Sequence, residues 1–405
     1  MNLVVVGQGY VGLPLAVAAS KSGYFVYGFD IDKSKIQDLK NGVTNSPEVN
    51  QAELIELQIS GRLQFVDTIP KITKPAIYVI AVPTPLDINR NPDLSMLKSA
   101  CELISTVVVD QSLIINESTS YIGTLNELIV PMIENSSGFK NLDFAVAPER
   151  IDPGNQNWSM KTTPRVLAGN SKSATARALE FYSLFCDQVH VVSNPRVAEA
   201  AKLMENTFRQ VNIALVNEFA QIANTLDFSA IEAIRAASTK PYGYMPFYPG
   251  VGVGGHCIPV DPTYLEFSAE KSGMKTNLVS VANKINFSTP RNIASMIRTM
   301  LGGDISMKSI QLAGISYKPN IADTRESPAQ ELYNQLSLMG AKVLWHDPIV
   351  NEWNGVLSQP LQTNLDLGII VTPHDQINFA PWVSSNVKVI DISSTQKDYG
   401  WPKFL

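Results

Sequence analysis

The stretch Leu3–Gly12, "LVVVGQGYVG", decides the fold of the first part of this chain. An apolar run leads into the pattern Gly7-x-Gly9-x-x-Gly12, and the next residues, "LPLAVAASKSG", predict a helix. A second apolar strand, "FVYGFD", ends at Asp30. Strand, glycine turn, helix, strand and acidic residue, in this order, form the fingerprint of a dinucleotide-binding βαβ unit.

Each part of the fingerprint has a physical task. The glycines permit a tight turn, close approach of the backbone to a pyrophosphate, and close packing of helix on strand. The helix N-terminus favours the negative charge of the pyrophosphate. Asp30 can accept hydrogen bonds from both ribose hydroxyls and, with no nearby cation, would repel a 2′-phosphate, so we expect NAD rather than NADP. The alternative is a glycine-rich turn in an α/β fold that binds no dinucleotide.

Apolar strands continue on both sides of a central helical segment. The first part contains "AIYVIAVP" (76–83), "SLIINES" (112–118), "FAVAPE" (144–149) and "VHVVS" (189–193). The last part contains "SIQLAGISY", "AKVLWHD", "DLGIIVTP" and "VKVIDIS", with a helix predicted from Ser327 to Gly340. Nearly continuous apolar strands alternating with helices predict parallel sheets covered on both faces. We therefore expect two Rossmann-like, doubly wound α/β domains, at residues 1–195 and 301–405.

The segment between them, residues 196–300, is predicted to be helical. Its longest stretch, "VAEAAKLMENTFRQVNIALVNEFAQIANTLD" (197–227), contains neither glycine nor proline. Apolar residues such as Met204, Phe208 and Leu215 recur at spacings typical of one helix face. Such a rod serves as a linker and as a dimer surface, and we expect a homodimer formed through it.

A polar stripe occupies another face of the same predicted helix. Lys202, Asn206 and Arg209 stand at positions i, i+4 and i+7, which brings them within about 60° of one another. The stripe is either a solvated face or a ligand face. Asparagine is a poor helix former, so its presence favours a functional role.

Bulk properties exclude several classes of function. The 405 residues carry a net charge of -5, which gives no reason to expect a nucleic-acid or membrane-surface partner. No apolar run approaches the roughly 20 residues of a membrane helix, and the N-terminus lacks the features of a signal peptide. Three cysteines do not suggest a disulfide framework. We expect a cytoplasmic protein and, with four scattered histidines and no C-x-x-C, no metal site.

One cysteine differs from the others. Cys257 lies in "PGVGVGGHCIPVDP" (249–262), a glycine-rich loop with His256 before it and Asp261 after it. Such a setting favours a reactive thiol, although simple loop packing would also explain His256. Cys101 and Cys186 lie in apolar helical settings and are predicted to be small buried hydrophobes.

Together these motifs resemble the UDP-glucose / UDP-N-acetylhexosamine 6-dehydrogenase family over nearly all of the chain. The matching pieces are "GQGYVG", "VPTP" (82–85), "ESTSYIGT" (117–124), "APERIDPGN" (147–155), "AEAAKLMENTFRQVNIALVNE" (198–218), "PGVGVGGHCIPVDP" and "YKPNIADTRESPA" (317–329). The resemblance implies an NAD domain, a central dimerising helix and a UDP-sugar domain. It also implies a four-electron oxidation of the sugar C6 alcohol to a carboxylate through a thioester, with two NAD per turnover, in polysaccharide biosynthesis.

The resemblance implies roles for individual residues. Cys257 corresponds to the nucleophile; Lys202, Asn206 and Asp261 surround the reacting C6, and Thr119 and Glu149 help to position water. The NAD contacts correspond to Gly7, Gly9, Tyr10, Val11, Gly12, Asp30, Lys35, Thr84, Thr119 and Arg325. The UDP-sugar contacts correspond to Arg150, Ile151, Lys202, Asn206, Arg209, Gly254, His256, Tyr317 and Lys318.

The sugar is predicted from departures within the motifs. Glucose-specific relatives carry a lysine where this chain has Val260, and enzymes for the manno sugar often carry a His-x-Arg pair where it reads "KPYGYMPFYPG" (240–250). These differences favour UDP-GlcNAc; UDP-ManNAc and UDP-glucose remain alternatives. Two rival functions are a β-hydroxy-acid dehydrogenase, which removes one hydride per turnover and needs no cysteine, and a nucleotide-sugar-binding protein that has lost catalysis.

Overall fold

A computed structural model describes residues 1–404 except 45, 47, 153, 154, 156, 256, 396 and 398. The chain divides into two compact units. The first consists of Met1–Glu205 and Thr263–Gly273, and the second of Asn206–Pro262 and Met274–Leu405. The long helix α7 (Pro195–Thr225) contributes to both, because the division falls within it.

The first unit is built on one eight-stranded sheet with the order β3-β2-β1-β4-β5-β6-β7-β8. Neighbouring strands are parallel except for β7, which runs antiparallel to β6. The strand order reverses between β1 and β4, which is the usual binding crevice of an open α/β sheet. The strands are β1 (Asn2–Val6), β2 (Phe25–Phe29), β3 (Leu63–Val66), β4 (Ile77–Ile80), β5 (Leu113–Asn116), β6 (Asp143–Val146), β7 (Arg165–Gly169) and β8 (Val189–Val191).

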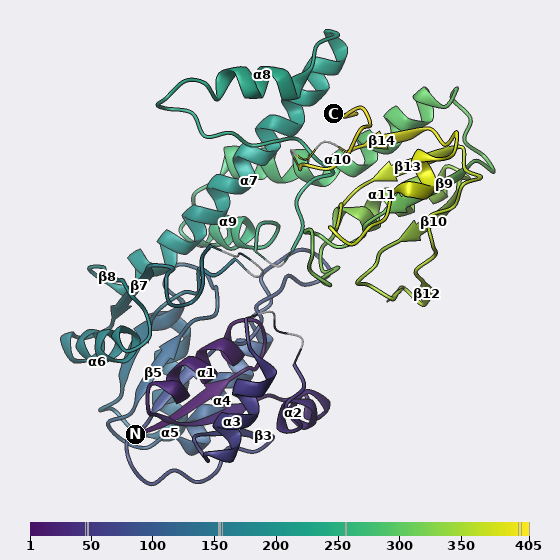
Figure 1. The fold of residues 1–405 in the computed structure, drawn as a ribbon. Helices are drawn as coiled ribbons and strands as arrows, with labels where there is room; N and C mark the ends of the chain where they lie inside the picture. Colours follow the sequence, from purple (N-terminus) through teal and green to yellow (C-terminus); the bar gives the residue numbers. More distant parts are fainter. Residues whose placement is uncertain are drawn as a thin grey trace. The chain divides into compact units, whose positions relative to one another are not determined.

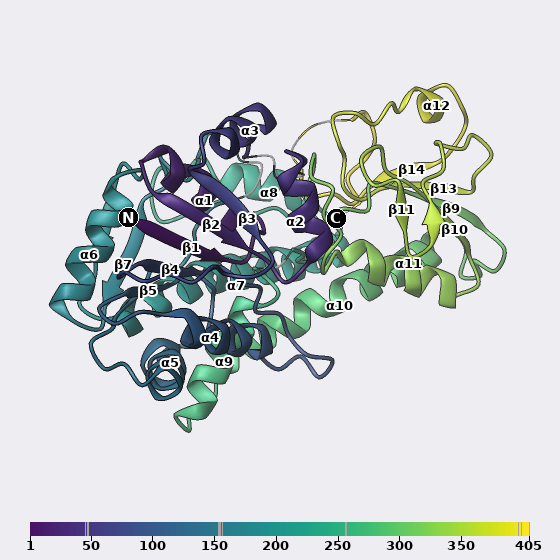
Figure 2. The ribbon, with the colours of Figure 1, turned by 90° about the horizontal axis from the view of Figure 1, so that it is seen from below.

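Helices cover both faces of this sheet because its central strands are apolar on both sides. Leu3 and Val5 pack with α1, α3 and α6, whereas Val4 and Val6 pack with α4 and α5. Figure 2 shows α1 and α3 on one side of the strands and α4 and α5 on the other. The helices are α1 (Gly12–Lys21), α2 (Lys33–Lys40), α3 (Gln51–Ile59), α4 (Ser95–Val107), the π-helical turn η1 (Leu125–Ile129), α5 (Val130–Ser137), α6 (Lys172–Ser183) and most of α9 (Asp261–Lys271).

The second unit combines helices with a smaller sheet, whose four strands are all parallel in the order β10-β9-β13-β14. Apolar residues of α10 and α11 pack on one face, and Trp382 of α12 packs on the other. Figure 1 shows α10 and α11 beside this sheet, and Figure 2 shows α11 and α12 on opposite sides of its strands. The strands are β9 (Ser309–Ala313), β10 (Lys342–His346), β13 (Leu367–Ile370), β14 (Val389–Asp391) and the hairpin β11 (Glu352–Trp353) and β12 (Val356–Leu357). Besides α7, the helices are α8 (Ala230–Ala237), α10 (Asn277–Met300), α11 (Pro328–Leu338) and α12 (Ala380–Val383).

The predicted fold class is confirmed, with two Rossmann-like sheets and a long helix between them in sequence. Ser327 caps α11, as expected, by accepting a hydrogen bond from the amide of Ala329. The strands β3 and β7 and the hairpin β11–β12 were not predicted. β3, β11 and β12 have only two to four residues each, and β7 begins with Arg165, a charged residue that apolar-strand patterns do not include.

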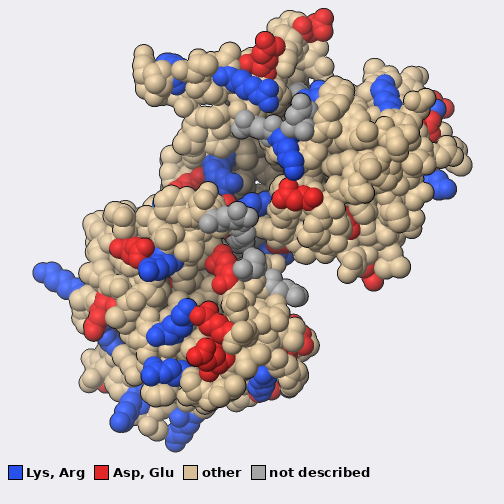
Figure 3. All heavy atoms as spheres, in the orientation of Figure 1, with Lys and Arg blue, Asp and Glu red and all other residues tan. Residues whose placement is uncertain are grey.

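The described helices include none long and apolar enough to cross a membrane. On the face drawn in Figure 3, basic and acidic side chains are interspersed and form no extended patch of one sign. This distribution agrees with the near balance of 32 basic and 37 acidic residues in the sequence.

The buried cysteine of α4 gives the first testable prediction. Cys101 is fully buried against β4 and β5, and burial raises the pKa of its thiol to about 12. Cys101→Ala removes packed atoms and leaves a small cavity, so we expect the unfolding free energy to fall by about 1–2 kcal/mol. Denaturant unfolding followed by circular dichroism measures this loss, and an unchanged midpoint would contradict the assigned packing.

Candidate active site

The three glycines of the turn after β1 have different surroundings. Gly7 has φ +97°, and a Cβ there would lie 2.4 Å from the carbonyl oxygen of Ala81. A Cβ at Gly12 would lie 1.9 Å from the carbonyl oxygen of Gly7, whereas one at Gly9 would meet nothing within 4 Å. Gly7 and Gly12 are therefore required by packing, and Gly9 faces open space beside the N-terminus of α1. This is the arrangement that a bound pyrophosphate needs.

Asp30 lies at the end of β2 beside this turn. Its carboxylate accepts hydrogen bonds from the amides of Gln8 and Asp32, at 2.9 and 3.0 Å. Lys35 Nζ also lies 2.9 Å from Asp30 Oδ2. The expectation that Asp30 has no nearby cation is therefore wrong, because α2 places a lysine there. The pair still offers acceptors for ribose hydroxyls, but Lys35 offsets part of the repulsion of a 2′-phosphate.

Two predicted threonines meet at the carboxyl edge of the same sheet. Thr84 follows β4 and Thr119 follows β5, and the Thr84 hydroxyl donates to the Thr119 carbonyl oxygen at 2.7 Å. The hydroxyl of Tyr264 donates to the Thr84 carbonyl oxygen at 3.3 Å. These contacts fix both loops at the edge where open α/β sheets bind their ligands.

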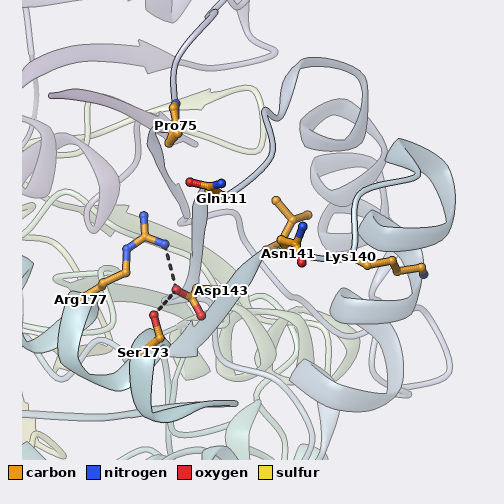
Figure 4. Close-up of a pocket in the computed structure, with 8 residues that line it drawn as sticks. Pro75, Gln111, Lys140, Asn141, Asp143, Ser173 and Arg177 are labelled. Atoms are coloured by element: carbon orange, nitrogen blue, oxygen red, sulfur yellow. Dashed lines mark hydrogen bonds and ion pairs between the residues drawn. The ribbon is translucent and has the colours of Figure 1, made fainter.

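A cavity of about 560 Å³ lies at the opposite edge of the sheet. Pro75, Gln111 and Asp143 stand at or just before the starts of β4, β5 and β6. Figure 4 shows Ser173 and Arg177 directed at Asp143, and both donate to its carboxylate. Because these groups pair with one another at the amino ends of the strands, we do not assign the cavity to the predicted site.

A buried cluster of charges surrounds Glu149, which follows β6. Arg165 Nη2 donates to Glu149 Oε2 at 2.5 Å, and Arg165 Nη1 lies 3.0 Å from Glu117 Oε1. The amides of Arg150 and Ile151 donate to Glu149 Oε1 at 2.6 and 2.7 Å. Three donors thus hold the Glu149 carboxylate in one orientation.

Glu117 is the second carboxyl of this cluster. The hydroxyl of Tyr182 donates to Glu117 Oε1, and the Arg165 guanidinium carbon lies 4.7 Å from the centre of the Tyr182 ring. Burial raises the pKa of Glu117 to about 7, against the stabilising charge of Arg165 and with a further upward contribution from Glu149. One guanidinium therefore serves two carboxyls inside the unit.

Arg150, predicted to contact the UDP-sugar, is engaged within the first unit. Its Nε and Nη2 pair with Glu205 of α7 at 3.1 and 2.7 Å, and its Nη1 donates to the Pro164 carbonyl oxygen at 2.6 Å. A ligand that uses Arg150 would have to share the guanidinium with Glu205 or displace it.

In the second unit, Cys257 opens a turn that leads into α9. The amides of Val260 and Asp261 donate to the Cys257 carbonyl oxygen at 3.2 and 2.9 Å. Asp261 is itself buried, and its Oδ2 accepts from Nδ2 of Asn206 at 2.5 Å. Cys257 is exposed, whereas Cys101 and Cys186 are buried as predicted. Three predicted residues thus lie close together in this unit: Cys257 in its turn, the Asp261 carboxylate and the Asn206 amide.

The glycines before Cys257 make room for a side chain. A Cβ at Gly254 would lie 2.8 Å from Cβ of Tyr317, and one at Gly255 would lie 2.7 Å from the Tyr317 ring. The Gly255 amide also donates to the Arg325 carbonyl oxygen at 3.1 Å, and the Arg325 guanidinium is held by Asp323. The loop of Cys257 is therefore packed against the segment that carries Tyr317, Lys318 and Arg325.

The three residues of the polar stripe on α7 differ in their burial. Lys202 and Asn206 are buried one helical turn apart, while Arg209 is exposed. His256 lies outside the described residues. Among the described residues, no group of three or more His, Cys, Asp or Glu side chains could hold a metal ion.

Sequence patterns did not single out Glu117, Arg165, Tyr182 or Asp323. One signal was present for Glu117: "SLIINES" ends an apolar strand with three polar residues, Asn116, Glu117 and Ser118, and all three are buried. Arg165 gave no comparable signal, because its strand was not predicted.

Sequence comparison places known domains along the chain. Three descriptions of the UDP-glucose/GDP-mannose dehydrogenase family match it in succession: the NAD binding domain at residues 1–186, the central domain at 196–288 and the UDP binding domain at 311–395.

Individual relatives match over most of the chain. UDP-N-acetyl-D-glucosamine 6-dehydrogenase of Pseudomonas aeruginosa is 35% identical over 358 residues, which are 87% of this chain and 83% of that protein. UDP-N-acetyl-D-mannosamine dehydrogenase of Pyrococcus horikoshii is 35% identical over 392 residues, or 95% and 92%. The solved structure of the UDP-D-ManNAc dehydrogenase from Pyrococcus horikoshii has a TM-score of 0.88 at 33% identity and covers 99% of this chain and 98% of that one. With an NAD-binding domain at its start, the chain therefore belongs to the UDP-glucose/GDP-mannose dehydrogenase family.

Proposed function

We propose that this enzyme oxidises the C6 alcohol of a UDP-N-acetylhexosamine to the carboxylate, with two NAD per turnover. The observation that carries the proposal is the exposed thiol of Cys257 in a turn whose Asp261 is hydrogen-bonded to Asn206. Relatives that act on UDP-N-acetylhexosamines, by their names, match most of the chain at 35% identity.

The side chains of this protein are suited to an oxidation that passes through a covalent adduct on Cys257. The Gly7–Gly12 turn and Asp30 would hold NAD, which would accept one hydride, and a second NAD in the same place would accept the other. After the alcohol has become an aldehyde, the Cys257 thiolate forms a carbon–sulfur bond to its C6 and the oxygen gains a proton, giving a thiohemiacetal. Loss of a second hydride and a proton leaves a thioester, and water then cleaves the carbon–sulfur bond to release the acid and the thiol.

Polar groups have matching tasks in this scheme. Lys202 and the Asn206 amide stabilise negative charge that develops on the C6 oxygen, and Asp261 accepts a proton. Glu149 and Thr119 orient the water that attacks the thioester. The thiol must stay reduced, so we place the enzyme in the cytoplasm.

The rival functions lack a use for these groups. A β-hydroxy-acid dehydrogenase employs a lysine and an asparagine on a helix but has no task for an exposed cysteine. A binding protein without catalysis has no need of the Asn206–Asp261 pair beside it. Both rivals therefore leave the second unit's site unexplained.

We further propose that residues 196–300 form a dimerisation domain. Met204, Phe208 and Leu215 are 62%, 43% and 60% exposed along one face of α7. An apolar stripe of this length on a helix fits the same stripe of a second copy.

For the sugar we propose UDP-GlcNAc. Val260 is buried where glucose-specific relatives carry a lysine, and "KPYGYMPFYPG" (240–250) lacks the His-x-Arg pair. We expect kcat/KM to fall in the order UDP-GlcNAc, UDP-ManNAc, UDP-glucose, measured by NADH absorbance with product masses. The highest value for UDP-glucose would refute the assignment to the hexosamine branch.

The nucleophile is tested by Cys257→Ser. Serine has no thiolate-like population at neutral pH, so acid production should fall on the order of a thousandfold or more, while UDP-sugar and NAD still bind. Cys101→Ala is the matched control and should change stability alone. Acid production at the wild-type rate in Cys257→Ser would exclude the covalent route.

The Asp30–Lys35 pair predicts opposite effects of two substitutions on cofactor choice. Asp30→Asn removes the repulsive carboxylate but keeps Lys35, so the ratio of kcat/KM for NAD over NADP should fall about tenfold or more. Lys35→Met leaves Asp30 without its cation, so the same ratio should rise. Steady-state kinetics with both cofactors measure the ratios, and a shift in the same direction for both variants would contradict this assignment.

A further inference from the structure

The buried cluster at Glu149 contains more negative groups than positive ones. Arg165 is 3% exposed and contacts both Glu149 and Glu117, which is 1% exposed. A single guanidinium cannot neutralise two ionised carboxylates in a cluster that is this deeply buried. One of the two carboxyls must therefore hold a proton over part of the neutral pH range.

Hydrogen bonding distinguishes the two carboxyls. Both oxygens of Glu149 receive donors: Arg165 on Oε2, and the amides of Arg150 and Ile151 on Oε1. Glu117 receives Tyr182 and Arg165 on Oε1, but its buried Oε2 has no hydrogen-bond partner among the described residues. Both Glu149 oxygens are thus occupied as acceptors, whereas a buried oxygen without a donor favours the protonated form of Glu117.

Rigid elements hold the cluster in place. Arg165 is the first residue of β7, its Nη1 also donates to the Ala147 carbonyl oxygen at 3.3 Å, and its guanidinium stacks over the Tyr182 ring of α6. The guanidinium thus has one available position, and the Glu149 carboxylate is fixed with it.

We propose that Arg165 and Glu117 are positioning residues for Glu149: Arg165 fixes the Glu149 carboxylate, and Glu117 holds the proton of the pair so that Glu149 stays ionised. The proposal rests on the proposed function, in which Glu149 orients the water that hydrolyses the thioester. It adds a defined protonation state to that step, and neither Arg165 nor Glu117 needs to touch the substrate.

The titratable groups around Glu117 and Glu149 determine the pH at which Glu117 loses its proton. Arg165, Glu149 and Tyr182 face Glu117, and Cys186 lies close enough to Arg165 and Tyr182 to interact with their charges. Glu48 and Asp152 act from the Glu149 side. The pKa of Glu117 is raised to about 7. Above that pH, the second anion takes up more of the charge of Arg165, so the Glu149 carboxylate accepts more strongly from the water that it orients, and hydrolysis should accelerate through this range.

The catalytic test is the pH dependence of thioester hydrolysis. Its rate is the decay of the Cys257 acyl adduct after a single turnover, followed by acid quench and intact mass. In the wild type, the rate of hydrolysis should rise in one step near pH 7, set by the pKa of Glu117. Glu117→Gln keeps the shape and mimics the protonated form, so it should match the wild type at pH 6 and be roughly three- to tenfold slower at pH 8.

Two further variants make the test specific. Tyr182→Phe removes a donor that lowers the pKa of Glu117, so the step should move to higher pH. Glu199→Gln is the matched control: Glu199 is another buried carboxylate with its pKa raised to about 7 by burial, but it caps η1 through the amides of Gly123 and Leu125. Glu199→Gln should retain the step.

Protein stability gives a readout that does not depend on the reaction. The folded-state pKa of Glu117 lies above its ordinary value of 4.5, so the folded protein keeps a proton that the unfolded chain releases between about pH 4.5 and 7. The wild type therefore loses the contribution of Glu117 to stability as pH rises through that window, and Glu117→Gln lacks this contribution at every pH. The melting temperature of Glu117→Gln relative to wild type should rise by roughly 2 °C or more between pH 5 and pH 8.

The two readouts separate the proposal from the proposed function. A constant difference in melting temperature between pH 5 and pH 8 would overturn the proposal, whatever the enzyme oxidises. A hydrolysis step that Glu117→Gln leaves in place would also overturn it. If the wild type oxidised no UDP-sugar, the proposed function would fail, and with it the role of Glu149, even if the melting temperatures showed the proton on Glu117.

Discussion

The architecture depends on one kind of close contact. The backbone of the turn that follows one strand packs directly against a carbonyl oxygen that lies just after the neighbouring strand. Gly7 follows β1 and would place a Cβ 2.4 Å from the Ala81 oxygen after β4. Gly314 follows β9 and would place one 1.7 Å from the Thr372 oxygen after β13. Both glycines have positive φ, so no other residue fits either place without strain. Each unit thus has a glycine of positive φ directly after its first strand, packed against the neighbouring loop.

The functional groups follow from these turns. In the first unit, the carboxyl ends of β1, β2, β4, β5 and β6 bring together the glycine turn, Asp30, the Thr84–Thr119 pair and Glu149. In the second unit, the turn at Cys257 packs on Tyr317 because Gly254 and Gly255 have no side chains. Each unit therefore presents a preformed set of groups. In the proposed function these groups have different tasks: Cys257 is the nucleophile, and Glu149 orients the water that attacks the thioester.

Sequence patterns predicted the parts of the structure that local physics determines. The glycine fingerprint, the apolar central strands and the long helix were recovered, because each depends on residues adjacent in the chain. Strand β3 was missed because an edge strand of four residues carries little periodicity, and β7, which lies between β6 and β8, was missed because it begins with a charged residue. The Lys35–Asp30 pair and the Glu117–Arg165–Glu149 cluster depend on contacts made by folding: Arg165 lies sixteen residues beyond Glu149, at the start of a strand that no pattern indicated. The burial that raises the pKa of Glu117 is likewise a property of the folded unit.

The central claim is a four-electron oxidation that one cysteine makes possible. The most direct test is the amount of NADH formed per molecule of acid when a limiting amount of UDP-GlcNAc is consumed to completion, with NADH read by absorbance and the acid by mass spectrometry. We expect two NADH for each acid and no aldehyde left in solution. One NADH for each product, with the aldehyde or a ketone as the end point, would contradict it.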